Sequence, residues 1–191
     1  MLENKYAFVG CSSSSKVDNE QFLNEAKKVG IALAHNKYGL VFGACNYGLM
    51  GEIYRNMKAH GSSIIGVAPT LYKDDFKVLE CDEEYVLDTV NERISLMIDK
   101  SDIIIFLTGG TGTLEEIIIA IEMKRRKEID KPIIIYDETG FYLPLIEQLK
   151  SIEKYKFSDN CTTFFEYVTN IEALDQILKT NVTKANILRL D

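Results

Sequence analysis

Two adjacent carboxylates follow a glycine-rich turn near the middle of the chain, and these residues are well placed to do chemistry. Glu115 and Glu116 come directly after TGGTGTL, residues 108–114. Glycines at positions 109, 110 and 112 allow a tight turn and a close approach of the backbone to a ligand. Because a helix that begins at such a turn has unpaired N–H groups, the turn predicts an anion site, most often for phosphate. A carboxylate beside a phosphate is unfavourable unless it takes part in a reaction.

Structural interpretations of the same residues stay open at this point. Thr113 and Glu116 match T-x-x-E, the capping-box pattern that satisfies N–H groups at the start of a helix. Arg93 lies at the edge of a predicted apolar stripe formed by Val90, Ile94 and Met97, where an arginine can simply extend its charge to solvent.

The elements that must position these residues follow from hydrophobic patterning. Ile103–Leu107 is a continuous apolar run, typical of a strand buried on both faces. Leu114, Ile117, Ile118 and Ile121 repeat at helical spacing after the turn. Further strands are predicted at residues 6–10, 40–42, 63–67, 85–87, 132–136 and 164–168. Further helices are predicted at 18–36, 91–100, 141–152 and 171–179, and one through Leu49, Ile53 and Met57 that ends near Gly61.

This alternation predicts an α/β fold, a single Rossmann-like domain over residues 1–191 with helices on both faces of a parallel sheet. Ligands bind such sheets at the carboxyl ends of the strands. Two more loops at those ends are rich in Gly or Ser, at residues 10–15 and 43–51. We therefore predict ligand contacts from Ser12, Ser13, Gly43 and Gly48. Alternatively, the serines cap the helix that starts near Asp18, and the glycines form a plain turn. The polar segment 74–84 is predicted to be a mobile loop over the site.

Composition narrows the classes of function. The net charge of −7 argues against a nucleic-acid partner, which would call for clustered Lys and Arg. The chain has no apolar run long enough to cross a membrane, and its first residues lack a signal-peptide pattern, so we expect a cytoplasmic protein. Four widely spaced cysteines without a C-x-x-C pair, and only two histidines, predict no metal site.

Standard nucleotide and hydrolase motifs are missing. The chain contains no G-x-x-x-x-G-K-[ST], no G-x-G-x-x-G after the first strand and no G-x-S-x-G. An anion cradle with nearby carboxylates therefore remains, without an evident nucleophile or metal.

The segment TGGTGTLEE resembles the P-G-G-x-G-T-x-x-E signature of the Lonely Guy family, phosphoribohydrolases that cleave the N-glycosidic bond of nucleoside 5′-monophosphates. GCSSSS, GLVFGACNYGLMG and IIGVAP resemble other conserved segments of that family in the same order. The resemblance implies a catalytic pair of Arg93 and Glu116. It also implies phosphate and ribose contacts from Gly109, Gly110, Thr111, Gly112, Thr113 and Glu115, no cofactor, and a homodimer.

Two positions depart from the family pattern. Thr108 stands where the signature has proline, and its hydroxyl is a possible further donor to the cradle. Ile94 stands where members that release cytokinins usually have lysine. Proteins of this family are often labelled lysine decarboxylases, but no lysine here lies in a setting that would hold pyridoxal phosphate. A non-catalytic nucleotide sensor and a hydrolase for another nucleotide, such as CMP, remain alternative functions.

Overall fold

One parallel sheet of seven strands organises the chain. The computed structural model describes residues 5–188, without the side chains of residues 75 and 182–188. The strand order is β4-β3-β2-β1-β5-β6-β7, and every neighbouring pair is parallel. The strands are β1 (Lys5–Gly10), β2 (Tyr38–Phe42), β3 (Ile64–Pro69), β4 (Glu83–Leu87), β5 (Ile103–Phe106), β6 (Ile133–Tyr136) and β7 (Glu166–Val168). The predicted α/β fold class is confirmed.

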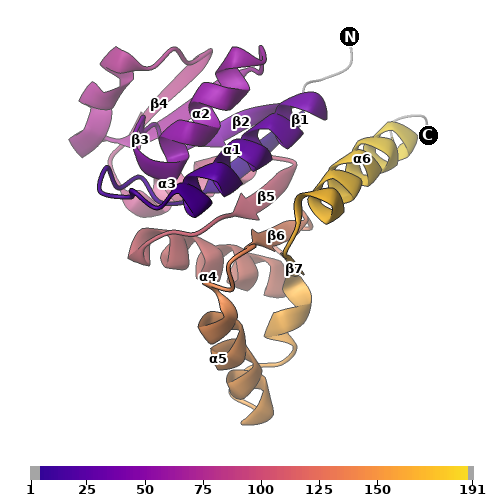
Figure 1. Cartoon of the computed structure of the whole chain (residues 1–191). Coiled ribbons are helices and arrows are strands. Elements are labelled where there is room, and N and C mark those ends of the chain that lie inside the picture. Colours follow the sequence, from indigo (N-terminus) through magenta and orange to yellow (C-terminus); the bar gives the residue numbers. More distant parts are fainter. Residues whose placement is uncertain (1–4, 189–191) are drawn as a thin grey trace.

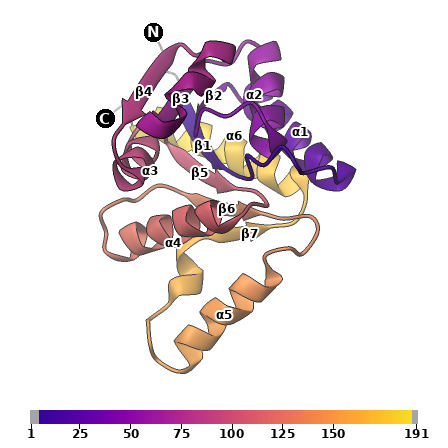
Figure 2. The same ribbon diagram turned by 90° about the vertical axis from the view of Figure 1, so that its left-hand side faces the viewer.

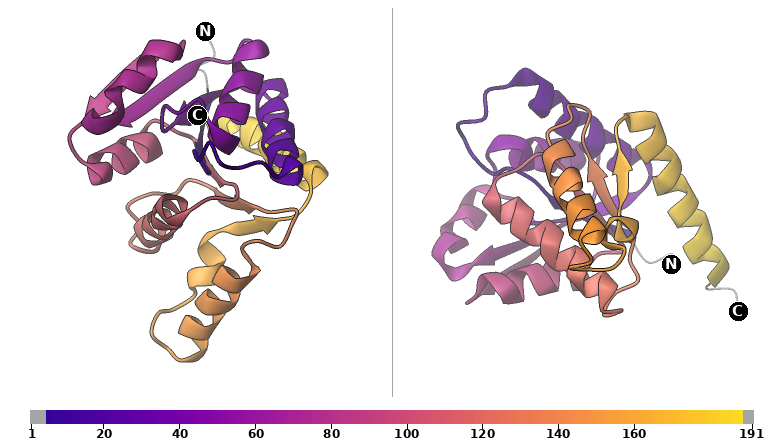
Figure 3. Two further views of the ribbon diagram at one scale, coloured as in Figure 1. Left: turned by 60° about the vertical axis from the view of Figure 1, so that its left-hand side comes forward. Right: turned by 90° about the horizontal axis from the view of Figure 1, so that it is seen from below.

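Helices cover both faces of this sheet (Figure 1). They are α1 (Glu20–His35), α2 (Gly48–Ala59), α3 (Val90–Asp99), α4 (Thr111–Arg125), α5 (Leu143–Lys154) and α6 (Ile171–Leu188). Helices α1, α2 and α6 pack on one face, and α3, α4 and α5 pack on the other. Side chains of the central strands alternate between these two apolar layers, which is why β5 and β6 carry continuous runs of isoleucine. Helix α5 extends away from the rest of the molecule (Figures 2 and 3).

The strand order reverses between β1 and β5: strands β2, β3 and β4 are added on one side of β1, and strands β5, β6 and β7 on the other. Strand β1 pairs with β2 on one side and with β5 on the other, so the chain leaves β1 and β5 toward opposite layers. The loops that follow these two strands therefore flank a crevice at the carboxyl edge of the sheet. A serine loop, residues 11–15, follows β1, and the glycine turn, residues 107–110, follows β5.

Several predicted boundaries are wrong, and the most important one concerns α4. This helix begins at Thr111 with Gly110 as its N-cap, so Glu115 and Glu116 lie in its second turn. A capping box built on Thr113 is therefore excluded. The capping box of this region lies instead at the start of α3. There, the side chain of Thr89 accepts from the Glu92 N–H and the side chain of Glu92 accepts from the Thr89 N–H.

Other differences lie farther from the crevice. Residues 70–78 form 3₁₀ turns, and β4 begins at Glu83, so the predicted loop 74–84 is partly regular. Phe164 ends a 3₁₀ turn instead of starting the last strand. Helix α6 continues to Leu188, and residues 1–4 and 189–191 lie outside the described residues. None of the helices that the structure describes is both long and apolar enough to cross a membrane.

Candidate functional site

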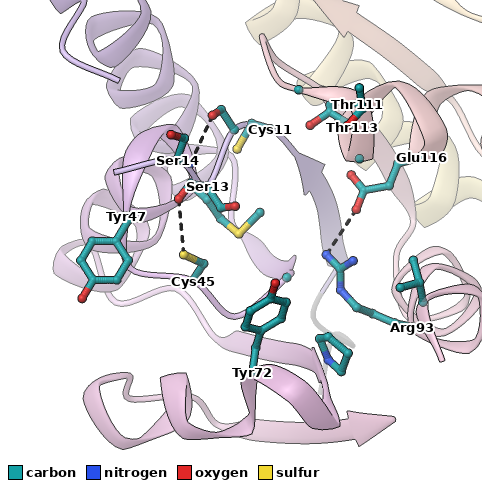
Figure 4. A pocket seen from close by; sticks show the side chains of 17 residues that line it. Cys11, Ser13, Ser14, Cys45, Tyr47, Tyr72, Arg93, Thr111, Thr113 and Glu116 are labelled. Atoms are coloured by element: carbon teal, nitrogen blue, oxygen red, sulfur yellow. Dashed lines mark hydrogen bonds and ion pairs between the residues drawn. The ribbon is translucent and has the colours of Figure 1, made fainter. Parts of the chain in front are cut away.

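The crevice between β1 and β5 holds a pocket of about 600 Å³. This volume suits a ligand of nucleotide size. Its walls come from the loops after β1, β2, β3 and β5, from the first turns of α2 and α3 and from the first two turns of α4 (Figure 4). The lining residues are Cys11, Ser12, Ser13, Ser14, Gly43, Cys45, Tyr47, Met50, Pro69, Tyr72, Val90, Arg93, Gly110, Thr111, Gly112, Thr113 and Glu116.

Arg93 and Glu116 meet at the bottom of this pocket, although they are far apart in sequence. Arg93 Nη2 lies 3.3 Å from Glu116 Oε1 (Figure 4), and Arg93 Nε donates to the carbonyl of Val67 at 3.2 Å. Their side chains are only 15% and 7% exposed. Arg93 therefore points into the pocket, and the alternative in which its charge extends to solvent is excluded.

Two glycines at the ends of neighbouring strands make room for this ion pair. A Cβ atom at Gly10 would lie 2.7 Å from Glu116 Oε2, which is closer than van der Waals contact. A Cβ atom at Gly43 would overlap Arg93 Nη2. Any larger residue at either position would displace one of the two charged groups. The ends of β1 and β2 are therefore shaped around the pair.

The electrostatics of Glu116 are set mainly by its burial. Burial raises the pKa of Glu116 to about 7, while the positive charge of Arg93 lowers it and the negative charge of Glu115 raises it. The positive charge of Arg93 favours the ionised form of Glu116, but the cost of burying the carboxylate outweighs that attraction. Glu116 therefore changes its protonation near neutral pH, where a general base works best.

Backbone groups beside Glu116 lie where the sequence predicts an anion cradle. The first N–H groups of a helix have no partner within it, and Gly110 has no side chain to cap those of α4. Gly110, Thr111, Gly112 and Thr113 all line the pocket, and open space surrounds the positions where Gly110 and Gly112 would carry a Cβ atom. Among the lining residues Arg93 is the only Lys or Arg side chain, so these backbone groups and Arg93 provide the site's positive potential.

The serine loop forms the wall opposite Glu116 (Figure 4). Ser12 N–H donates to the Thr108 carbonyl at 3.1 Å, and the Ser12 carbonyl accepts from Met50 N–H at 3.1 Å. Helix α1 is capped by Asn19, whose side chain accepts from Gln21 N–H, so the alternative in which the serines cap this helix is wrong. Ser12 and Ser13 both line the pocket, as predicted.

Three predicted contact residues do not line this pocket. Glu115 is exposed, and nothing brings it to the crevice. Gly109 borders a smaller neighbouring cavity, where a Cβ atom would overlap the side chain of Thr113. Gly48 has a φ of +59° and lies against the backbone of the serine loop, so its role is the close packing of α2.

Other lining residues were not predicted. Pro69, Tyr72 and Val90 close the side of the pocket next to β3, and Cys45 faces Ser13 with its thiol 3.7 Å from the Ser13 carbonyl. Val90 was assigned to the apolar stripe of α3, yet it is 45% exposed. Cys11 is buried, and burial together with the nearby Glu116 raises the pKa of its thiol well above the usual value, which disfavours a nucleophilic thiolate.

Comparison with known proteins identifies the family. A sequence profile described as "Possible lysine decarboxylase" matches residues 50–178. The cytokinin riboside 5′-monophosphate phosphoribohydrolase of Mycobacterium tuberculosis is 34% identical over 135 residues, which cover 70% of this chain and 71% of that protein. LOG1 of Arabidopsis thaliana, named as the same type of phosphoribohydrolase, is 30% identical over 159 residues, covering 80% and 73% of the two chains. The chain belongs to the Lonely Guy family.

Solved structures show the fold beyond this family. The molybdenum cofactor binding protein of Rippkaea orientalis aligns with a TM-score of 0.70 over 95% of this chain and 99% of its own, at 18% identity. The DNA processing protein A of Helicobacter pylori aligns with a TM-score of 0.63 over 93% of this chain and 81% of its own, at 14% identity. At such low identity these structures support the Rossmann-like fold alone.

The decarboxylase description of the Lonely Guy profile implies pyridoxal phosphate, which would need a lysine for a Schiff base. The pocket lining contains no lysine, so it does not fit that cofactor. Within the described residues, no group of three or more His, Cys, Asp or Glu side chains is arranged to hold a metal ion.

Both departures from the Lonely Guy pattern lie outside the pocket lining. Ile94 is fully buried in the apolar layer of α3 and α4. Thr108 is 7% exposed, and its hydroxyl finds no hydrogen-bond partner within the described part of the chain. The expectation that this hydroxyl joins the cradle is therefore not supported, because Thr108 lines the neighbouring cavity instead.

Replacing Thr108 with valine is expected to stabilise the protein. The substitution keeps the shape of the side chain and removes a buried hydroxyl that has no partner, which should raise the free energy of unfolding by about 1 kcal/mol. Thermal unfolding should shift upward by about 2–4 °C for a chain of this size. Thr139→Val is the matched control, because the Thr139 hydroxyl donates to Asp137 at 2.9 Å and its loss should destabilise. A lower melting temperature for Thr108→Val would contradict the assignment.

Proposed function

We propose that this protein hydrolyses the N-glycosidic bond of a nucleoside 5′-monophosphate and releases a free base and ribose 5-phosphate. The observation that carries the proposal is the buried Arg93–Glu116 pair directly beside the anion cradle of α4. Its phosphoribohydrolase relatives at 30–34% identity support the same reaction class.

In this proposal the phosphate binds the N–H groups at the start of α4, with the hydroxyl of Thr113 as a further donor. Binding there uses the positive end of the helix, and it holds the ribose against Glu116. The phosphate takes no part in bond breaking, so its binding energy serves to orient the sugar. Thr113 is 5% exposed and lines the pocket between Gly112 and Glu116.

The reaction consumes one water molecule. As the bond between the anomeric carbon and the base breaks, its electron pair leaves with the base nitrogen, and positive charge builds up on the ribose as in glycosidases. The Glu116 carboxylate stabilises that charge and accepts a proton from the attacking water, whose oxygen bonds to the anomeric carbon. The departing nitrogen takes up a proton from solvent or from Glu116. Arg93 holds the carboxylate and the sugar hydroxyls in position.

The base is proposed to occupy the end of the pocket formed by Cys45, Tyr47, Met50 and Tyr72. Aromatic and thioether groups provide flat and adaptable apolar contacts for a base. We propose AMP or a cytokinin riboside 5′-monophosphate as the substrate type, in line with the names of the relatives.

We further propose a cytoplasmic homodimer, as the family resemblance implies. Leu71 and Tyr72, beside the pocket, are 80% and 56% exposed, and these apolar side chains are candidates for the contact between subunits. The mass of the protein in solution, measured by light scattering at micromolar concentration, distinguishes the dimer from a monomer.

A panel of substrates tests the function directly. The protein is incubated with AMP, CMP, GMP, UMP and an N6-substituted AMP, each paired with its unphosphorylated nucleoside, and free base and ribose 5-phosphate are measured. We expect base release from at least one monophosphate, with kcat/KM at least about 10²-fold higher than for the matching nucleoside.

Each alternative has its own outcome in this panel. Equal rates for a monophosphate and its nucleoside would remove the cradle from the mechanism. Preference for CMP would assign a different nucleotide substrate to the same chemistry. Tight nucleotide binding with no base released from any compound would favour a non-catalytic sensor.

A further inference from the structure

The glycine turn that starts the cradle is held by a side chain from outside the pocket. Tyr142, the N-cap residue of α5, is 1% exposed, and its hydroxyl donates to the Leu107 carbonyl at 2.8 Å. Leu107 is the first residue of the turn, and its own N–H donates to the Gly10 carbonyl at 2.9 Å. The bond from Tyr142 therefore fixes the point where the chain leaves β5.

The phenolic oxygen of Tyr142 also meets the other side of the turn. Burial raises the pKa of Tyr142, and the nearby backbone N–H of Gly109 is among the effects that lower it. The hydroxyl thus lies at the turn itself, where it donates to the residue before Thr108 and lies near the N–H of the residue after it.

Tyr142 is itself anchored by a fully buried carboxylate. Asp137, at the end of β6, is 0% exposed and accepts from the Tyr142 N–H at 2.8 Å. It also accepts from Phe141 N–H at 3.0 Å, from the N–H and hydroxyl of Thr139, and from the hydroxyl of Tyr167 at 2.9 Å. With so many donors around one carboxylate, the start of α5 has little freedom to move.

We propose that Tyr142 is a positioning residue that sets the phosphate cradle, by fixing Leu107 so that the N–H groups after Gly110 face the pocket. This inference rests on the proposed function, since it assigns the cradle to a sugar phosphate. Tyr142 does not line the pocket and acts only through the backbone of the turn.

The chain offers a close control for this proposal. Tyr38 is also 1% exposed, and its hydroxyl also donates to a backbone carbonyl, that of Leu178 at 3.4 Å. Tyr38 lies at the start of β2, so it is at the amino ends of the strands, whereas the pocket is at their carboxyl ends. Tyr142→Phe and Tyr38→Phe each remove one buried hydroxyl, so a general loss of packing or stability should affect both variants.

The experiment measures kcat/KM for a nucleoside 5′-monophosphate and for the matching nucleoside. In Tyr142→Phe the ratio of the two values should fall about 10-fold, the effect expected for the loss of one well-placed hydrogen bond. In Tyr38→Phe the ratio should equal that of the wild type. An unchanged ratio in Tyr142→Phe, or an equal fall in both variants, would overturn the proposal.

A binding measurement separates this inference from the proposed reaction. Titration with ribose 5-phosphate reports the cradle without any catalysis, and Tyr142→Phe should bind it about 10-fold more weakly than Tyr38→Phe. If the wild type releases no base but this difference in binding is seen, the proposed reaction fails and the positioning role stands. Equal affinity of the two variants, or no binding to the wild type, overturns the role of Tyr142. If Tyr142→Phe does not fold, Tyr167→Phe loosens Asp137 instead and should shift the same ratio in the same direction.

Discussion

Glu116→Gln is expected to slow base release from a nucleoside 5′-monophosphate by about 10²–10⁴-fold. Glutamine has nearly the same shape and can still accept a hydrogen bond from Arg93, so the pocket should keep its form. It cannot accept a proton from water, and it carries no negative charge to stabilise the developing charge on ribose. Single-turnover kinetics with saturating enzyme would measure the chemical step directly, without interference from product release.

The control for this variant lies on the same helix. Glu122 pairs with Arg125 on the surface of α4, and Glu122→Gln removes a carboxylate from an ion pair far from the pocket. Its base release should match that of the wild type. At pH 5 Glu116 is largely protonated because its pKa is about 7, so the wild type and Glu116→Gln should melt at similar temperatures there. Turnover by Glu116→Gln at the wild-type rate would remove Glu116 from the mechanism.

The sequence predicts the strand before the glycine turn, the turn itself and the presence of a helix after it, because these patterns depend on local physics. Ile103, Ile104 and Ile105 are fully buried, since a central strand of a parallel sheet is covered on both faces. The glycines at 110 and 112 allow the backbone to face open space at the helix start. The pairing of Arg93 with Glu116 was available only from the family resemblance, because residues so far apart in sequence meet through the packing of α3 beside α4.

The capping box shows where a local pattern misleads. T-x-x-E occurs at Thr113–Glu116 and again at Thr89–Glu92, and only the second is at a helix start. The start of α4 is set by where β5 ends and the chain crosses the edge of the sheet. That point depends on the partners of Leu107 and Thr108, which lie in β1, in the serine loop and at the start of α5, and no single sequence window contains them.

The pocket walls were less predictable because they depend on tertiary contacts. Val90 continues the helical spacing of Ile94 and Met97, yet it sits in the first turn of α3, at the edge of the crevice, and remains 45% exposed. Gly10 and Gly43 are visible as glycines in the sequence. Their function, to leave space for the two charged side chains, is seen only when the ends of β1 and β2 are placed beside Arg93 and Glu116.

Arg93→Ala is expected to reduce kcat/KM by about 10²-fold and to move its pH dependence upward. If ionised Glu116 is the active form, kcat/KM of the wild type should rise with pH and level off above about 7. The charge of Arg93 lowers the pKa of Glu116 and so opposes the effect of burial. Without Arg93 the buried carboxylate should need a higher pH to ionise, and the rise in kcat/KM should shift in that direction.

Two further variants test whether the shift in the pH dependence of kcat/KM is specific to the loss of Arg93. Arg93→Lys keeps a positive charge but cannot bond to the Val67 carbonyl as Arg93 Nε does, so its profile should lie between those of the wild type and Arg93→Ala. Arg125→Ala removes an arginine from the surface pair with Glu122 and should leave the profile unchanged. The phosphate of the substrate has a pKa of about 6. This pKa is a property of the free ligand and should not change when Arg93 is replaced. A profile that stays in place in Arg93→Ala would therefore show that the rise reports the substrate and not Glu116, and a shift to lower pH would contradict the electrostatic role of Arg93.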